Sequence, residues 1–208
     1  MNKKRSVVKN TKFWILIFSI VYVIAFFIAY ILTKNYEFIG YVALMAFLII
    51  LVYKLNKKYD FPSWILLGLS LWGIMHMAGG MIKFGKDVLY AYVLVPIYSH
   101  PEIIELTIFK YDQFAHFYFY LFATLFLYYL IKPYLVKEYS WGVIALFLIF
   151  AGMGVGALNE LVEFLMVLML ENTGVGGYYN TLLDIVFNTL GAVLAVLIIA
   201  IIRKNGRK

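Results

Sequence analysis

Three pairs of polar residues at helical spacing lie within long apolar stretches of this sequence. They are Asp112 with His116, Glu160 with Glu163, and Asp184 with Asn188. Residues three or four positions apart share one face of a helix, so the two side chains of each pair would point in the same direction. Acidic groups inside a membrane helix are energetically costly and commonly mark functional sites. These pairs therefore predict a polar site inside a membrane protein.

Imidazole and carboxylate side chains together allow two kinds of chemistry. They can hold a divalent ion such as zinc, manganese or iron, which would activate water for hydrolysis. The candidate metal ligands are His76, Asp112, His116 and Glu160. Two close carboxylates in a low-dielectric site can also act as general acid and base without a metal. The candidate catalytic residues are Glu160, Glu163 and Asp184, and the candidates for orienting a substrate are Asn180 and Asn188.

Purely structural roles remain open for some of these residues. A single histidine or asparagine often joins neighbouring membrane helices by a hydrogen bond, and Asp112 could cap the helix that it begins. A structural role is less favoured for the acids further along the chain, because a carboxylate in lipid needs a partner. No Lys or Arg lies within residues 113–131, 141–170 or 181–202 to pair with them, and no HExxH metal motif is present.

Six apolar stretches would position the polar pairs. They cover residues 13–32, 38–53, 62–82, 113–131, 141–170 and 181–202. A membrane-spanning helix needs roughly 20 apolar residues, and 64% of this 208-residue chain is hydrophobic. The sequence therefore predicts an all-α fold, a polytopic bundle of six transmembrane helices that forms one integral membrane domain over residues 1–208.

The positive charge indicates how this bundle is oriented. Most of the 18 Lys and Arg residues fall in alternate connections, at residues 1–12, 54–58, 132–137 and 203–208. The positive-inside rule then predicts a multi-pass protein of the cell membrane, with a cytoplasmic basic arm at 1–12 and a cytoplasmic basic tail at 203–208. The net charge of +7 is explained by orientation and by contact with anionic lipid, rather than by nucleic-acid binding. The chain has no cysteine, which excludes disulfides and thiol chemistry.

This topology would bring polar groups from four helices to one depth. His76 lies roughly 21 Å along the third stretch from its cytoplasmic end, and the fourth and sixth stretches enter from the opposite side, beside Asp112 and Asp184. The fifth stretch reaches Glu160 after roughly 28 Å. We therefore expect a shared cavity that opens away from the cytoplasm.

Two segments near this cavity are unusual. The fifth stretch is longer than a bilayer requires and contains Gly152, Gly154 and Gly156, which predict either close helix packing or a break that faces the cavity. The connection at residues 83–111 contains an apolar segment, 88–98, that is too short to span. We expect that segment to lie at the membrane interface or to cover the cavity as a re-entrant lid.

The polar motifs resemble those of known membrane protein families. His76-Met-Ala-Gly79-Gly80, Asp112-Gln-Phe-Ala-His116-Phe117 and Glu160-Leu-Val-Glu163-Phe164 are similar to segments of the YjdF-type family of bacterial inner-membrane proteins. The second of these motifs, Glu160, and the segment at 184–192 also resemble the wider VanZ-like family. The resemblance covers about residues 70–195, with Asn180, Leu182 and Glu163 as departures from the family patterns. It implies a role in the cell envelope, since VanZ-like proteins are associated with low-level resistance to a glycopeptide antibiotic.

Three functions are compatible with these features. The first is a metal-assisted hydrolase or transferase that acts on a membrane lipid or a lipid-linked envelope precursor. The second is a proton- or cation-coupled transporter that uses the same carboxylates as a relay. The third is a non-catalytic protein that binds a lipid or an antibiotic. The cytoplasmic halves of the stretches carry almost no ionisable groups, which disfavours the transporter.

Overall fold

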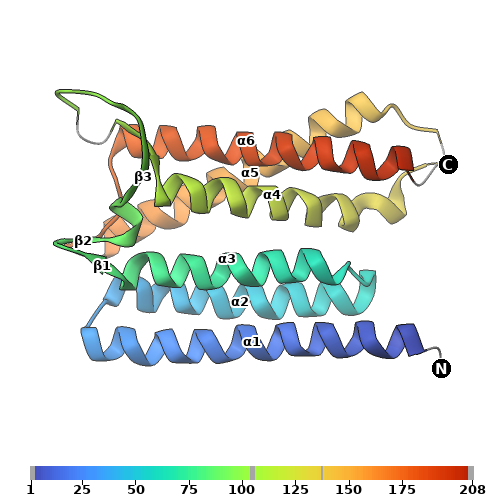
Figure 1. Ribbon diagram of the computed structural model, residues 1–208, viewed down its shortest axis with the longest axis horizontal. Helices are drawn as coiled ribbons and strands as arrows, with labels where there is room; N and C mark the ends of the chain where they lie inside the picture. Colours follow the sequence, from blue (N-terminus) through green and yellow to red (C-terminus); the bar gives the residue numbers. More distant parts are fainter. Residues whose placement is uncertain (1–2, 104–105, 137, 206–208) are drawn as a thin grey trace.

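Six long helices make up most of the molecule, as the sequence predicts (Figure 1). The computed structural model describes residues 3–103, 106–136 and 138–205. The helices are α1 (Lys3–Thr33), α2 (Tyr36–Tyr59), α3 (Ser63–Met81), α4 (Tyr111–Ile131), α5 (Trp141–Met169) and α6 (Tyr178–Asn205). Each contains a window that is long and apolar enough to cross a membrane. The predicted six-helix membrane fold is therefore confirmed.

The two ends of the bundle differ in what they carry. Both chain termini lie at one end, here called the terminal end, and all the short strands lie at the other, the strand end (Figure 1). Helix α1 begins at Lys3, so the basic segment predicted as a separate arm continues the first membrane helix. Residues 1–2, Lys137 and residues 206–208, which belong to the predicted basic segments, lie outside the described residues.

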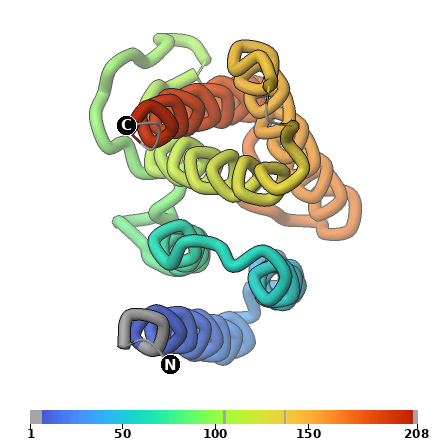
Figure 2. The backbone as a smooth tube through the Cα atoms, turned by 90° about the vertical axis from the view of Figure 1, so that its right-hand side faces the viewer, coloured from blue at the N-terminus to red at the C-terminus, as the bar shows by residue number. Residues whose placement is uncertain are grey.

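The helices form two groups, α1 to α3 and α4 to α6 (Figure 2). Helix α4 packs most extensively against α6. Gly191 of α6 allows this close approach, because a Cβ atom there would clash with the backbone carbonyl oxygen of Phe117 in α4. Ala192 and Ala195 in the following turn are fully buried. Small residues on one face of α6 thus set the distance between the two helices that carry Asp112, His116, Asp184 and Asn188.

Helix α5 is continuous through its three glycines and crosses α4 and α6 obliquely (Figures 1 and 2). Its 29 residues extend over roughly 43 Å, and the oblique path lets this length fit the bundle. Gly152 packs against Thr124 and Ala192, and Gly156 packs against Asn188. Gly152 and Gly156 therefore serve close helix packing, and the alternative of a broken helix is wrong.

The connection between α3 and α4 forms two small antiparallel hairpins, which were not expected. Strand β1 (Lys83–Phe84) pairs with β2 (Asp87–Val88), and the short 3₁₀ helix η1 (Leu89–Ala91) follows. Gly85 in the first hairpin has a φ of 65°, a conformation that favours glycine.

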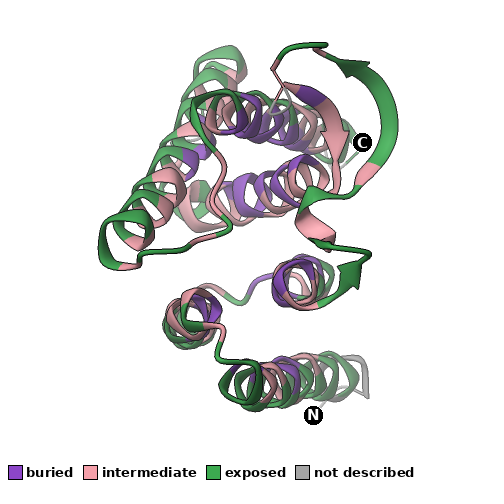
Figure 3. Ribbon diagram, turned by 90° about the vertical axis from the view of Figure 1, so that its left-hand side faces the viewer, coloured by how far each residue is buried: buried purple, intermediate pink, exposed green. Residues whose placement is uncertain are grey.

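The second hairpin pairs β3 (Val93–Ser99) with β4 (Thr107–Lys110). Strand β3 is almost entirely exposed at the strand end (Figure 3). It pairs with β4 at Val93, Tyr98 and Ser99, with an irregularity between the first two. The turn of chain around η1 lies against α3 and α4. The expected position of this segment, at the membrane interface or as a re-entrant lid, stays a prediction.

Candidate functional site

A small polar cavity lies between the two helix groups, close to the strand end. Its volume is about 70 Å³, which is room for an ion with one or two water molecules. The carboxyl, imidazole and amide side chains that line it come from α2, α3, α4, α5 and α6, namely Glu37, His76, Asp112, His116, Asn159, Glu163 and Asn180. No Lys or Arg is among its lining residues in the part of the chain that the structure describes. The cavity wall is therefore acidic.

His116 of α4 is buried among four carboxylates, Asp112, Glu160, Glu163 and Asp184, and these five residues are here called the acidic cluster. Its Nδ1 lies 2.9 Å from the amide oxygen of Asn188 on α6. Because that oxygen can only accept a hydrogen bond, Nδ1 carries the proton. Nε2 then faces Asp112, whose Oδ1 is 3.5 Å away. This is the arrangement found in metal-binding histidines, in which one ring nitrogen donates to a neighbouring oxygen and leaves the other free to bind the ion.

Asn180 joins the carboxylates of two helices. Its Nδ2 donates to Asp112 Oδ2 at 3.0 Å and to Asp184 Oδ2 at 2.7 Å. Asp112 therefore faces the cluster instead of capping α4, whose N-cap position is Lys110. The amide holds two acidic groups from α4 and α6 beside the same histidine.

Helix α5 contributes two further carboxylates near His116. Ligand atoms of His116, Glu160 and Glu163 all lie within 4.8 Å of one another, and those of Asp112, His116 and Asp184 satisfy the same limit. Asn159 Nδ2 donates to Glu163 Oε1 at 2.8 Å. His116 thus belongs to two overlapping groups of potential metal ligands, which draw on α4, α5 and α6.

Some buried oxygen atoms in this cluster have no hydrogen-bond partner among the described residues. They include Asp184 Oδ1 and Glu160 Oε1. Asp184 is fully buried. Buried carboxylate oxygens are normally paired with donors, with cations or with a metal. These two atoms are therefore the strongest structural indication of a bound cation.

His76 lines the same cavity from α3 but belongs to neither ligand group. Its ring stacks on Trp72, with 5.2 Å between the ring centroids, and Tyr90 in η1 forms a hydrogen bond with its Nδ1. Burial raises the pKa of the Tyr90 phenol well above its usual value, so this group stays protonated. Of the four predicted metal ligands, Asp112 and Glu160 thus lie in two different ligand groups that share His116, and His76 lies in neither.

The two asparagines predicted to orient a substrate occupy different positions. Asn180 lines the cavity, whereas Asn188 is only 1% exposed and is not among the lining residues. Asn188 contacts His116 directly. Its position is suited to orienting the histidine rather than to contacting a substrate.

Sequence reasoning did not identify Glu37 and Tyr90 as residues of this cavity. Glu37 lies in the first turn of α2, and its Oε2 accepts a hydrogen bond of 2.7 Å from the backbone of Gly174, in the loop before α6. The predicted topology placed the start of the second helix at the same membrane depth, so this acid could have been found. Tyr90 follows an apolar segment and carried no comparable signal.

Comparisons with known proteins agree with the membrane fold. The family described as "Predicted membrane protein (DUF2238)" matches residues 14–205. No curated protein and no solved structure matches the chain. The match includes all six helices and every residue of the acidic cluster. The protein therefore belongs to the DUF2238 family of predicted membrane proteins, which is the YjdF-type family that its motifs resemble.

Proposed function

We propose that this protein is a membrane-embedded, metal-dependent hydrolase or transferase that acts on the polar end of a lipid or lipid-linked substrate. The observation that carries the proposal is the pair of unpartnered buried oxygens, Asp184 Oδ1 and Glu160 Oε1, beside His116. A cation bound there would neutralise carboxylates that have no Lys or Arg within residues 113–131, 141–170 and 181–202 to pair with.

The donor set indicates the type of ion. One imidazole with several carboxylate oxygens suits manganese or iron, while structural zinc sites typically use more nitrogen or sulfur ligands. His116 Nε2, Asp112, Asp184 and Glu160 would hold the ion. When bound, it would supply a polarised water for hydrolysis or a Lewis acid for group transfer. Asn188 and Asn180 would fix the ligand side chains, as residues behind metal ligands commonly do.

The remaining residues would bind and orient the substrate. His76, held by Tyr90, and Asn180 line the space beside the ligand groups, while Glu163 can act as a base for a proton of the substrate or water. The positive-inside rule favours an orientation with the strand end away from the cytoplasm. The substrate would therefore enter from the outer leaflet, in agreement with the resemblance to VanZ-like proteins and with a role in the cell envelope.

The packing between this site and the terminal end favours an enzyme over a transporter. Helices α4, α5 and α6 fill that region with buried apolar side chains such as Leu125, Leu148 and Ile199. A proton or cation relay would need polar groups at intervals along the path.

Metal content of the purified protein tests the proposal. After loading with Mn²⁺ and removal of free ion, we expect close to one ion per wild-type chain by elemental mass spectrometry. His116→Ala and Asp184→Asn should both lose it while retaining the helical circular dichroism spectrum. His100→Ala is the matched control, because His100 bonds only to backbone in the second hairpin and should leave metal content unchanged.

Two results would overturn the metal site. One is a folded wild-type protein that stays metal-free at millimolar Mn²⁺. The other is a His116→Ala variant that binds as much Mn²⁺ as the wild type. If the metal is present, incubation of the loaded protein with an extract of bacterial membrane lipids should release a head group detectable by mass spectrometry, and Glu163→Gln should abolish that release.

A further inference from the structure

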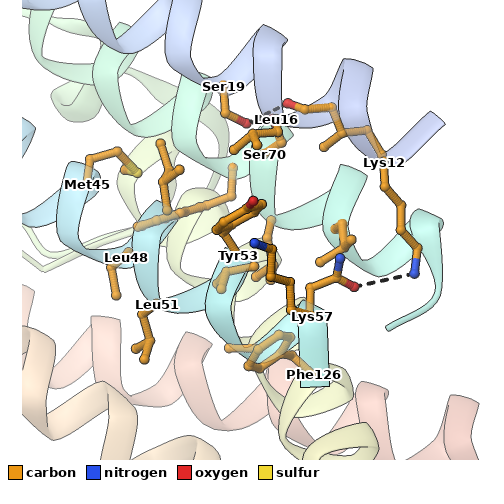
Figure 4. A pocket seen from close by; sticks show the side chains of 18 of the residues that line it. Lys12, Leu16, Ser19, Met45, Leu48, Leu51, Tyr53, Lys57, Ser70 and Phe126 are labelled. Atoms are coloured by element: carbon orange, nitrogen blue, oxygen red, sulfur yellow. Dashed lines mark hydrogen bonds between the residues drawn. The ribbon is translucent and has the colours of Figure 1, made fainter. Parts of the chain in front are cut away.

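A second cavity, much larger than the first, opens at the terminal end of the bundle. Its volume is about 1170 Å³, and its walls come from α1, α2, α3, α4 and one residue of α5. Most of the lining is aliphatic or aromatic, including Leu16, Met45, Leu48 and Phe126 (Figure 4). Pockets for drug-sized ligands have volumes of roughly 300–1,000 Å³, so this one can hold a larger molecule.

The polar side chains deep in this cavity are already paired with each other. Ser19 Oγ donates to the carbonyl oxygen of Ile15 at 2.9 Å, and it lies 2.7 Å from Ser70 Oγ. They therefore do not require a polar ligand. Within a bilayer, a space lined by hydrocarbon is suited to hydrocarbon, because water there would find few partners.

The mouth of the cavity is positively charged. Lys9, Lys12 and Lys57 line it, together with the single acid Asp60. Lys12 is committed to an ion pair of 2.6 Å with Asp60, whereas Lys9 and Lys57 are exposed. Lys12 and Lys57 come from two different helices, as Figure 4 shows. This arrangement complements an anionic group at the membrane surface.

The length of the cavity corresponds to one leaflet. From Lys12 at the mouth to Tyr22 near its inner end, α1 rises roughly 15 Å, which is half of a 30 Å hydrocarbon core. The inner end is closed by Trp72 and Phe119, whose rings stack with centroids 3.9 Å apart. These two residues also line the small polar cavity, so they separate the two spaces.

We propose that this cavity binds one anionic phospholipid from the leaflet at the terminal end. Its acyl chains occupy the apolar space up to Trp72 and Phe119, and its phosphate lies between Lys9 and Lys57. This site is distinct from the polar cavity, which no Lys or Arg of the described residues lines. It is also independent of the proposed catalytic function, since it involves none of the metal ligands.

Native mass spectrometry of the protein released from nanodiscs tests this assignment. The nanodiscs contain equal amounts of phosphatidylglycerol and phosphatidylcholine. We expect the wild type to retain one phosphatidylglycerol molecule. The double variant Lys9→Gln/Lys57→Gln should retain it roughly tenfold less, because each lysine near the surface contributes to the attraction of an anionic lipid. Lys132→Gln is the matched control, since Lys132 lies at the same end but outside the cavity and should leave retention unchanged.

A second variant tests the acyl-chain part of the site. Leu48→Trp places a bulky group in the cavity and should reduce retention of the bound lipid without changing the metal content. The assignment is overturned if the double variant and Lys132→Gln retain phosphatidylglycerol equally. It is also overturned if phosphatidylcholine is retained as well as phosphatidylglycerol, or if Leu48→Trp has no effect on retention.

Discussion

The two cavities of this protein meet at Trp72 and Phe119 but are built in opposite ways. The one at the strand end has about 70 Å³ and is lined by acids, amides and histidines that are fixed by hydrogen bonds. The one at the terminal end has about 1170 Å³ and an apolar wall with lysines only at its mouth. The first is suited to hold small groups at defined positions. The second is a large apolar space, which does not hold its contents at defined positions.

The packing around the two cavities differs accordingly. Around the polar cavity, α4 and α6 approach closely through Gly191 and Ala192, and α5 crosses both through Gly152. Around the apolar cavity, α1, α2 and α3 leave space between themselves and α4. A site for chemistry requires rigid support for its side chains, whereas a site for flexible chains tolerates a loose wall. Three experiments test this difference between the two regions.

Cysteine labelling, which reports the orientation in the membrane, should give the largest effect, because each position is either labelled or not. The chain has no cysteine, so Lys86→Cys in the first hairpin and Val136→Cys between α4 and α5 each introduce a single exposed thiol. In intact spheroplasts we expect a membrane-impermeant maleimide to label Lys86→Cys only, because the positive-inside rule places the terminal end in the cytoplasm. Val136→Cys should react only after permeabilisation, and the reverse pattern would place the polar cavity on the cytoplasmic side.

Overpacking should affect the two regions unequally. Gly191→Ala forces a Cβ atom against the backbone of Phe117, which cannot rotate away, so we expect a loss of about 3 kcal/mol in the free energy of unfolding. Leu48→Phe enlarges a side chain that faces the apolar cavity and should change that quantity by about 0.5 kcal/mol at most. Unfolding in detergent, followed by circular dichroism, measures both.

Gly154→Ala is the control for the loss of a helical glycine. A Cβ atom at this position would meet nothing within 4 Å, so the substitution should leave stability unchanged or raise it by up to about 1 kcal/mol. If Gly191→Ala were as mild as Gly154→Ala, the close packing of α4 on α6 could not be what fixes the acidic cluster.

Removal of a supporting amide should give the smallest effect on the proposed metal site. Asn180→Ala leaves every metal ligand in place but releases Asp112 and Asp184, so Mn²⁺ affinity should fall by about 10- to 100-fold. Titration with Mn²⁺ by isothermal calorimetry measures this change. Asn172→Ala, in the exposed loop between α5 and α6, is the control and should bind Mn²⁺ like the wild type. If Asn180→Ala bound Mn²⁺ as tightly as the wild type, Asn180 would not support the metal ligands.

Much of the fold and of the polar cavity could be predicted from the sequence. Hydropathy is a local property, so all six helices were found, and the ends of α3 to α6 lie within a few residues of the predicted stretches. Helix α1 begins earlier, at Lys3, and α2 continues to Tyr59, because the polar ends of these helices carry no hydropathy signal. Helical spacing fixed the common face of Asp112 and His116, and alternating topology brought α3 to α6 together at one depth. These inferences succeed because they need only helix geometry and the thickness of a bilayer.

The remaining features depend on contacts that no local pattern encodes. The hairpins at residues 83–110 are too short for a periodic signal, and the bond from Asn188 to His116 depends on the rotation of α6 about its axis. The apolar cavity was missed entirely. Helices that are apolar on every side, such as α1 and α2, do not reveal which faces contact protein and which face a cavity or lipid.

Helix α2 contributes lining residues to both cavities. Near its middle, Met45 and Leu48 form part of the apolar wall, and at its strand end Glu37 holds the loop at Gly174, which lines the polar cavity. An α-helix moves largely as a rod over this length. Any shift of α2 that makes room for a guest molecule at the terminal end will therefore pull on the loop that borders the acidic cluster. If both proposals hold, occupancy of the lipid site in one leaflet would thereby be linked to access to the acidic cluster from the other.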